Sequence, residues 1–130
     1  MYETLQQKIS TTDKTIWFHC ASLGEFEQGV PIMEAIKNLK PDHKIVVSFF
    51  SPSGYEIKKN TPLADVVVYL PMDTPSNAKK FISAVHPSFT FFVKYEFWPN
   101  YLFELQKRTV PTLLISGVFR GDQIFFKSYG

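Results

Sequence analysis

The sequence predicts a doubly wound α/β domain built on a parallel sheet. Short apolar segments alternate regularly with longer segments whose apolar residues recur at spacings of three and four, which is the helical period. The short segments are apolar at every position, as expected of parallel strands that helices cover on both faces. The chain has 130 residues, the length of one domain, so we expect a single domain over residues 1–130.

Five strands and four helices are expected in alternation. The first strand, residues 16–21, precedes a helix over 25–39 that places Phe26, Val30 and Met33 on one face and closes before Pro41. Runs rich in Val, Ile, Leu and Phe predict the later strands, and prolines at first helical positions predict two of the later helices. These later elements are a strand at 45–50, a helix at 54–60, a strand at 66–70, a helix at 75–85, a strand at 89–93, a helix at 99–108 and a strand at 112–115.

Composition narrows the class of protein. Apolar residues make up 45% of the chain and charged residues 20%, which excludes intrinsic disorder. The 14 Lys and Arg residues nearly balance the 12 Asp and Glu residues. Nucleic-acid binders usually carry a concentrated basic face, so this balance gives no support for a nucleic-acid partner. The single cysteine, Cys20, cannot form an internal disulfide, and we expect it to be an inert core thiol in a reducing compartment. No apolar run approaches the roughly 18 residues that span a bilayer, and residues 1–12 are no signal peptide, so the chain is expected to be soluble.

Ligands of open parallel sheets bind outside the carboxyl ends of the strands, so the segments that follow the strands are the candidates for a ligand site. Two of them, Ser22–Glu25 and Ser53–Glu56, match the capping box, in which a serine is followed three residues later by a glutamate. In a third, Asp73 or Thr74 could cap a helix that begins at Pro75. Neither a GxxxxGK[ST] nor a GxGxxG phosphate loop occurs.

The residues themselves leave the roles of the charged candidates open. Glu25 could act as a general base at the strand end, or it could only complete a capping box, which is the commoner role at this position. Lys94 and Glu96 follow a strand and would point the same way in an extended segment, either over the ligand crevice or as a solvated ion pair. The turn 51–54 could hold an anion on helix N–H groups, but a simple capped turn is favoured.

No metal site or cofactor is expected. The three histidines, His19, His43 and His86, lie far apart in the sequence without the spacing of metal ligands. His19 lies near the end of the first strand, where it could face the crevice or serve as a structural histidine. Residues 124–126 are expected to begin a further helix.

Four segments at strand ends together resemble a known family. They are Ala21-Ser22-Leu23-Gly24-Glu25-Phe26, Phe49-Phe50-Ser51-Pro52-Ser53-Gly54-Tyr55, Tyr69-Leu70-Pro71-Met72-Asp73-Thr74 and Lys94-Tyr95-Glu96-Phe97-Trp98-Pro99-Asn100. In this order they are similar to the N-terminal domain of 3-deoxy-D-manno-octulosonic acid (Kdo) transferases, the lipid A glycosyltransferases of Gram-negative bacteria. The resemblance runs from about residue 16 to residue 130.

The resemblance implies a fold, a reaction and a set of site residues. The fold is one half of a GT-B glycosyltransferase, in which two Rossmann-like domains face each other, and the reaction is metal-independent, inverting transfer of Kdo from CMP-Kdo to a lipid A precursor. Glu25 falls on the family's catalytic base, and Glu96 becomes a second important carboxylate. Arg120 follows a segment, Ser116-Gly117-Val118, where many members have Asn-Ala-Arg. The acceptor-binding residues implied are Ser22, Gly24, Ser51, Ser53, Gly54, Lys94 and Arg120.

The resemblance also implies partners and a location. The donor-binding C-terminal domain and a preceding membrane anchor are expected to lie outside these residues, which leaves the isolated chain inactive. The full-length protein is expected to work at the cytoplasmic face of the inner membrane. A stand-alone flavodoxin-like binding domain and a protein-interaction module with exposed aromatic residues are the alternatives.

Overall fold

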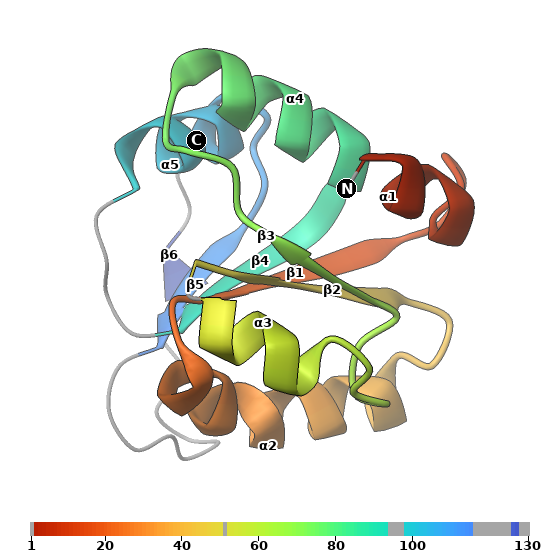
Figure 1. Ribbon diagram of the computed structural model, residues 1–130. Helices are drawn as coiled ribbons and strands as arrows, with labels where there is room; N and C mark the ends of the chain where they lie inside the picture. Colours follow the sequence, from red (N-terminus) through yellow and green to blue (C-terminus); the bar gives the residue numbers. More distant parts are fainter. Residues whose placement is uncertain (1, 51, 94–97, 116–125, 128–130) are drawn as a thin grey trace.

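A central sheet lies between two layers of helices in the computed structural model, which describes residues 2–50, 52–93, 98–115 and 126–127. Helices α2 (Leu23–Leu39) and α3 (Pro52–Lys58) cover one face, and α1 (Tyr2–Lys8), α4 (Pro75–Val85) and α5 (Pro99–Lys107) cover the other (Figure 1). The strands are β1 (Thr15–Cys20), β2 (Lys44–Phe49), β3 (Val66–Tyr69), β4 (Pro87–Val93), β5 (Thr112–Ile115) and β6 (Phe126–Lys127).

The strand order is β3-β2-β1-β4-β5-β6, and every neighbouring pair is parallel except β5 with β6. The chain therefore winds outward from β1 to β3, crosses back through α4, and continues from β4 on the other side of β1. This reversal places a topological switch point between β1 and β4, which is where open α/β sheets bind ligands. The predicted doubly wound α/β fold with five parallel strands is confirmed.

Two core layers bury the faces of the sheet, and β1 contributes to both. Trp17 packs with Phe81, Phe92 and Tyr101 beneath α4 and α5, whereas Phe18 belongs to the layer beneath α2. All six residues of β1 are buried. This strand, paired on both edges and covered on both faces, is the centre of the fold.

Sequence reasoning failed at two ends of the chain and at one aromatic residue. Helix α1 was not expected in a polar segment, yet it buries Leu5 beside Ile9 in the core. Phe126 was expected to begin a helix and instead lies in β6, antiparallel to β5. Phe50 was expected in the core, but it is 52% exposed because β2 ends at Phe49.

Helix α1 should depend on one side chain. We expect Leu5→Ala to lower the free energy of unfolding by about 2–3 kcal/mol, the low end of the range for buried leucines, because a helix of 7 residues can detach instead of leaving a full cavity. Urea unfolding measures this, with Glu3→Ala on the exposed side of the same helix as the control. Equal effects of the two changes would contradict the packing of α1 described above.

Candidate functional site

The candidate site begins where β1 gives way to α2. Ser22 occupies the N-cap position of α2 with extended backbone, and the buried Glu25 lies in the first turn. The Ser22 hydroxyl donates a hydrogen bond to Oε2 of Glu25 and makes no capping bond to the backbone. The expected capping box at Ser22–Glu25 is therefore wrong. The structure instead holds one carboxylate oxygen of Glu25 with a neutral donor from the preceding loop.

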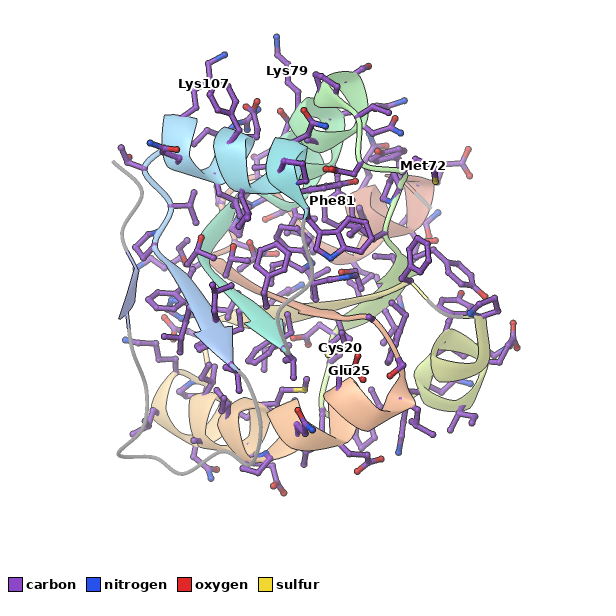
Figure 2. All side chains as sticks on the ribbon, turned by 90° about the vertical axis from the view of Figure 1, so that its left-hand side faces the viewer. Cys20, Glu25, Met72, Lys79, Phe81 and Lys107 are labelled. Carbon is purple, nitrogen blue, oxygen red and sulfur yellow. The ribbon has the colours of Figure 1, made fainter. Side chains whose placement is uncertain are left out.

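Glu25 lies over the end of the central strand. Figure 2 shows its side chain beside Cys20, the last residue of β1. Burial raises the pKa of the Cys20 thiol, and the nearby Glu25 carboxylate raises it further. Cys20 therefore stays a neutral thiol, as the sequence predicted, and leaves Glu25 as the group on this side of the strand end that is able to accept a proton.

Helix α3 packs closely against the start of α2. A Cβ atom added to Gly54 would lie 2.6 Å from Cδ1 of Phe49 and 3.2 Å from the backbone nitrogen of Leu23. Gly54 is thus required by packing. By contrast, among the described residues a Cβ atom on Gly24 would meet only Oγ of Ser22, at 3.8 Å. The surface at Gly24 is therefore open, next to the Ser22–Glu25 pair.

The second expected capping box is also wrong. Helix α3 begins at Pro52, so Ser53 lies inside the helix instead of before it. Glu56 Oε2 accepts a hydrogen bond from Nζ of Lys59 at 3.0 Å, an exposed pair one turn apart. An exposed pair of this kind contributes at most about 1 kcal/mol.

A polar network lies on the opposite face of β1. Nε1 of Trp17 donates to Oγ of Ser48 at 2.8 Å, and Nδ1 of His19 lies 2.8 Å from the same oxygen. The indole can only donate, whereas the Ser48 oxygen can accept two hydrogen bonds and donate one, so the hydrogen of the His19–Ser48 contact can come from either partner. Burial lowers the pKa of His19 to about 3, so its imidazole is neutral at physiological pH.

Trp98 joins this network from the start of α5. The centroid of its indole ring lies 5.0 Å from the centroid of the His19 ring, in an edge-on arrangement, and 5.4 Å from the centroid of the Phe50 ring. Among the described residues, neither Nε2 of His19 nor Nε1 of Trp98 has a hydrogen-bond partner. The contact of His19 with Ser48 supports the expectation that His19 is a structural residue. A structural role does not explain why Nε2 of His19 and Nε1 of Trp98 are buried without a partner among the described residues.

The loop between β3 and α4 contains one confirmed cap and one reassigned residue. Oγ1 of Thr74 accepts from the Asn77 N–H at 3.1 Å, so Thr74 caps α4, and Pro75 is its first residue as predicted. Asp73 does not cap α4. Its Oδ1 accepts from the N–H groups of Asn100 and Tyr101, at 3.1 and 3.4 Å, and thus caps α5.

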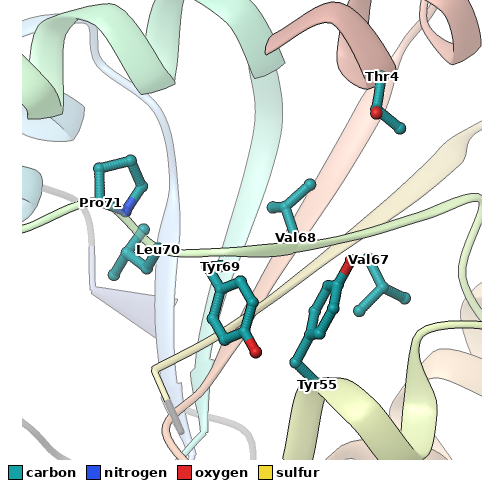
Figure 3. Close-up of a pocket in the computed structure, with 7 residues that line it drawn as sticks. All are labelled: Thr4, Tyr55, Val67, Val68, Tyr69, Leu70 and Pro71. Carbon is teal, nitrogen blue, oxygen red and sulfur yellow. The ribbon is translucent and has the colours of Figure 1, made fainter. Parts of the chain in front are cut away.

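A cavity of about 340 Å³ opens at the outer edge of β3, between α1 and α3 (Figure 3). The rings of Tyr55 and Tyr69 stack on one side of it with centroids 4.2 Å apart. Sequence reasoning placed Tyr55 among the aromatic residues near strand ends but did not predict a cavity. The one hint in the sequence is Tyr69, which brings a hydroxyl group to the end of a strand that otherwise consists of three valines.

Several predicted site residues lie outside the described part of the chain: Ser51, Lys94, Glu96, Arg120 and the side chain of Ser53. The structure brings Ser22, Gly24 and Glu25 together at the start of α2 and packs the backbone of Gly54 against them. Over the described ranges, no group of three or more His, Cys, Asp or Glu side chains is placed to share a metal ion. In those same ranges no helix is both long enough and apolar enough to cross a membrane.

Comparison with known proteins decides the family. A family model described as 3-deoxy-D-manno-octulosonic-acid transferase (kdotransferase) matches residues 2–127. This chain belongs to that family. The 3-deoxy-D-manno-octulosonic acid transferase of Aquifex aeolicus is 31% identical over 120 residues, 92% of this chain and 32% of the relative. Enzymes of the same name from Haemophilus influenzae and Chlamydophila psittaci are 33% and 27% identical over 76% and 85% of this chain.

The Kdo transferase family match has two consequences. It covers the whole described fold, from α1 to β6, so it disfavours the stand-alone flavodoxin-like and protein-interaction alternatives. The chain spans only 32%, 23% and 26% of the length of these three curated relatives. The family assignment therefore applies to this chain as a whole.

The two glycines of the site give a matched pair of substitutions. We expect Gly54→Ala to destabilise the chain by about 1–3 kcal/mol, because the new methyl group would overlap the Phe49 ring. Gly24→Ala should leave stability unchanged or raise it by about 0.5–1 kcal/mol, because the space is open and alanine favours a helix. Thermal unfolding of both variants tests this, and equal losses would contradict the close approach of α3 to α2.

The buried imidazole predicts a pH dependence of stability. An unfolded chain binds a proton at His19 near pH 6.5, whereas the folded chain does so only near pH 3, so stability falls as the pH drops between these values. From pH 6.5 to 5 we expect a loss of about 1.5 kcal/mol that His19→Gln removes. Chemical unfolding at several pH values measures the slope. The control is His43→Gln, which removes the histidine that pairs with Asp42 and should keep the slope due to His19.

Proposed function

We propose that this chain is the acceptor-side domain of a glycosyltransferase that transfers Kdo from CMP-Kdo to a lipid A precursor. The observation that carries the proposal is the buried carboxylate of Glu25, which accepts a hydrogen bond from Ser22 at the carboxyl end of the central strand. It lies at the edge of the sheet where such folds bind ligands. Membership of the Kdo transferase family and the activity for which its relatives are named support the same reaction.

Glu25 serves as the general base in this proposal. Ser22 holds Oε2, and within the described ranges no side chain or backbone group bonds to Oε1, which can take the proton of an incoming sugar hydroxyl. The hydroxyl oxygen bonds to the anomeric carbon of Kdo while the bond from that carbon to the phosphate oxygen of CMP breaks. CMP leaves with the bonding electrons, and the proton stays on Glu25. Attack from the face opposite CMP inverts the anomeric carbon.

The proposal assigns roles to further residues besides this base. Glu96 supplies a second carboxylate and Lys94 a cation from the segment that leads into α5. Gly24 supports the proposal through the open surface beside Glu25. The remaining proposed acceptor-binding residues are Ser22, Ser51, Ser53, Gly54 and Arg120.

The proposal extends to the rest of the protein. Residues 1–130 form one domain of a GT-B pair, and a second Rossmann-like domain binds CMP-Kdo across the cleft. The lipid acceptor approaches from the cytoplasmic face of the inner membrane. The proposed transfer is metal-independent, and its protons and electron pairs balance with Glu25 and the leaving phosphate.

Glu25→Gln in the full-length protein tests the proposal. The amide cannot accept the hydroxyl proton but keeps the shape and the Ser22 contact, so we expect kcat to fall by about 10²–10⁴ with unchanged thermal stability. Transfer is measured by mass spectrometry of the lipid product formed from CMP-Kdo and a tetra-acylated lipid A precursor.

Glu34→Gln, an exposed change on the same helix, is the control and should keep full activity. Transfer at the wild-type rate by the Glu25→Gln protein would overturn the role of Glu25 as the base. A wild-type protein that transfers no Kdo would overturn the reaction itself.

A further inference from the structure

We propose that Asp73 is a positioning residue for the acceptor site, which fixes the start of α5 and, with it, Trp98 at the carboxyl edge of the sheet. The proposal rests on the proposed function, because it assigns Asp73 a role in the same site. Asp73 lies in the loop after β3 and belongs to one of the segments by which the chain resembles Kdo transferases, yet neither the family match nor the proposed mechanism gives it a role.

Helix α5 lacks a cap of its own. Trp98 occupies the N-cap position, and its side chain makes no capping bond. Pro99, the first helical residue, has no N–H group to satisfy. The next two N–H groups, of Asn100 and Tyr101, both point at Oδ1 of Asp73, at 3.1 and 3.4 Å. A carboxylate at this end of a helix is favoured by the hydrogen bonds and by the helix dipole.

Further hydrogen bonds from the same helix fix the loop in return. Nδ2 of Asn100 donates to the backbone carbonyl of Asp73 at 3.0 Å, and the hydroxyl of Tyr101 donates to the carbonyl of Pro71 at 2.7 Å. Nδ2 of Asn77, on α4, donates to the carbonyl of Met72 at 3.1 Å. The loop is therefore held at successive residues by the starts of two helices.

This arrangement determines where Trp98 lies. Its indole is packed against the His19 ring on β1 and the Phe50 ring after β2. Contacts thus connect the loop after β3 to the central strand. Asp73 in that loop bonds to the first turn of α5. Trp98, at the start of α5, contacts His19, which lies three residues before Ser22.

A role in stability alone does not account for the choice of residues. A serine, asparagine or aspartate at position 98 would cap α5 locally and satisfy the same N–H groups. The sequence instead places tryptophan there, and the cap comes from Asp73, 27 positions before Asn100. The distant cap couples two loops at the edge of the sheet where ligands bind, which a local cap could not do.

The test compares Asp73→Ala with Asp73→Asn in the full-length protein. In the alanine variant we expect kcat for Kdo transfer to fall by about 10- to 100-fold, because displacing substrate-positioning groups costs up to this much. The asparagine variant should recover most of the rate, since its carboxamide oxygen can still accept both N–H bonds. The KM for CMP-Kdo should stay unchanged in both, because the other domain binds the donor in the proposed function.

Asp65→Ala provides a structural control at the opposite edge of the sheet. Oδ2 of Asp65 accepts from the Ile45 N–H at 2.8 Å, so its loss removes a comparable side-chain to backbone bond before β3 instead of after it. We expect this variant to lose stability but to keep kcat within about twofold of wild type at temperatures where it is folded. A matching loss of kcat in Asp65→Ala would overturn the positioning role of Asp73.

Hydrogen exchange followed by mass spectrometry tests the contact between Asp73 and the start of α5 without a measurement of Kdo transfer. Peptides that cover the start of α5 should exchange faster in Asp73→Ala than in wild type, and Asp73→Asn should restore their protection. Unchanged exchange in Asp73→Ala, or faster exchange with an unchanged kcat, would overturn the proposal. If the wild-type protein transfers no Kdo, the proposed function fails together with the catalytic part of this proposal, while the exchange experiment still decides whether Asp73 holds α5.

Discussion

The burial of β1 on both faces is the constraint on which the rest of the structure depends. The strand is paired with β2 and β4, and all six of its residues are buried. Side chains at alternate positions must therefore suit two different core layers, with Trp17 beneath α4 and Phe18 beneath α2. A strand fixed in this way delivers the residues that follow it, Ser22 to Glu25, to a defined place at the edge of the sheet.

Polar residues in such a strand must find partners inside the protein. Oγ1 of Thr15 donates to the carbonyl of Val85 at 2.6 Å, which ties the beginning of β1 to the end of α4. At the other end, Ser48 connects Trp17 and His19, and the imidazole stays neutral because burial disfavours its charged form. These bonds anchor both ends of the central strand, so the carboxyl edge of the sheet is held by side chains as well as by the ladder of backbone bonds.

Periodicity predicted most of the fold because the elements are long and strongly patterned. The helix at 75–85 and the strand at 112–115 were predicted with the bounds that the structure shows. Helix α1 could not be predicted, since its stability comes from Leu5 contacting a core that only the folded chain creates. At the start of α2, Ser22 and Glu25 bond to each other instead of forming the expected capping box. Asp73 and Thr74 were both candidate caps of α4, and the sequence does not reveal that α5 begins beside Asp73.

Three of the helices that start at the carboxyl edge of the sheet, α2, α4 and α5, have their first N–H groups satisfied in different ways, and the difference bears on function. Thr74 caps α4 locally and Asp73 caps α5 from a distant loop, so both helices gain stability from their caps. At α2, by contrast, the two residues with capping ability, Ser22 and Glu25, bond to each other, and among the described residues no side chain accepts from the N–H groups of the first turn. Helix α2 does without this stabilisation, although its neighbours have it. Local sequence rules are expected to fail where a site needs the groups for something else, so the uncapped start of α2 supports the proposed role of Glu25.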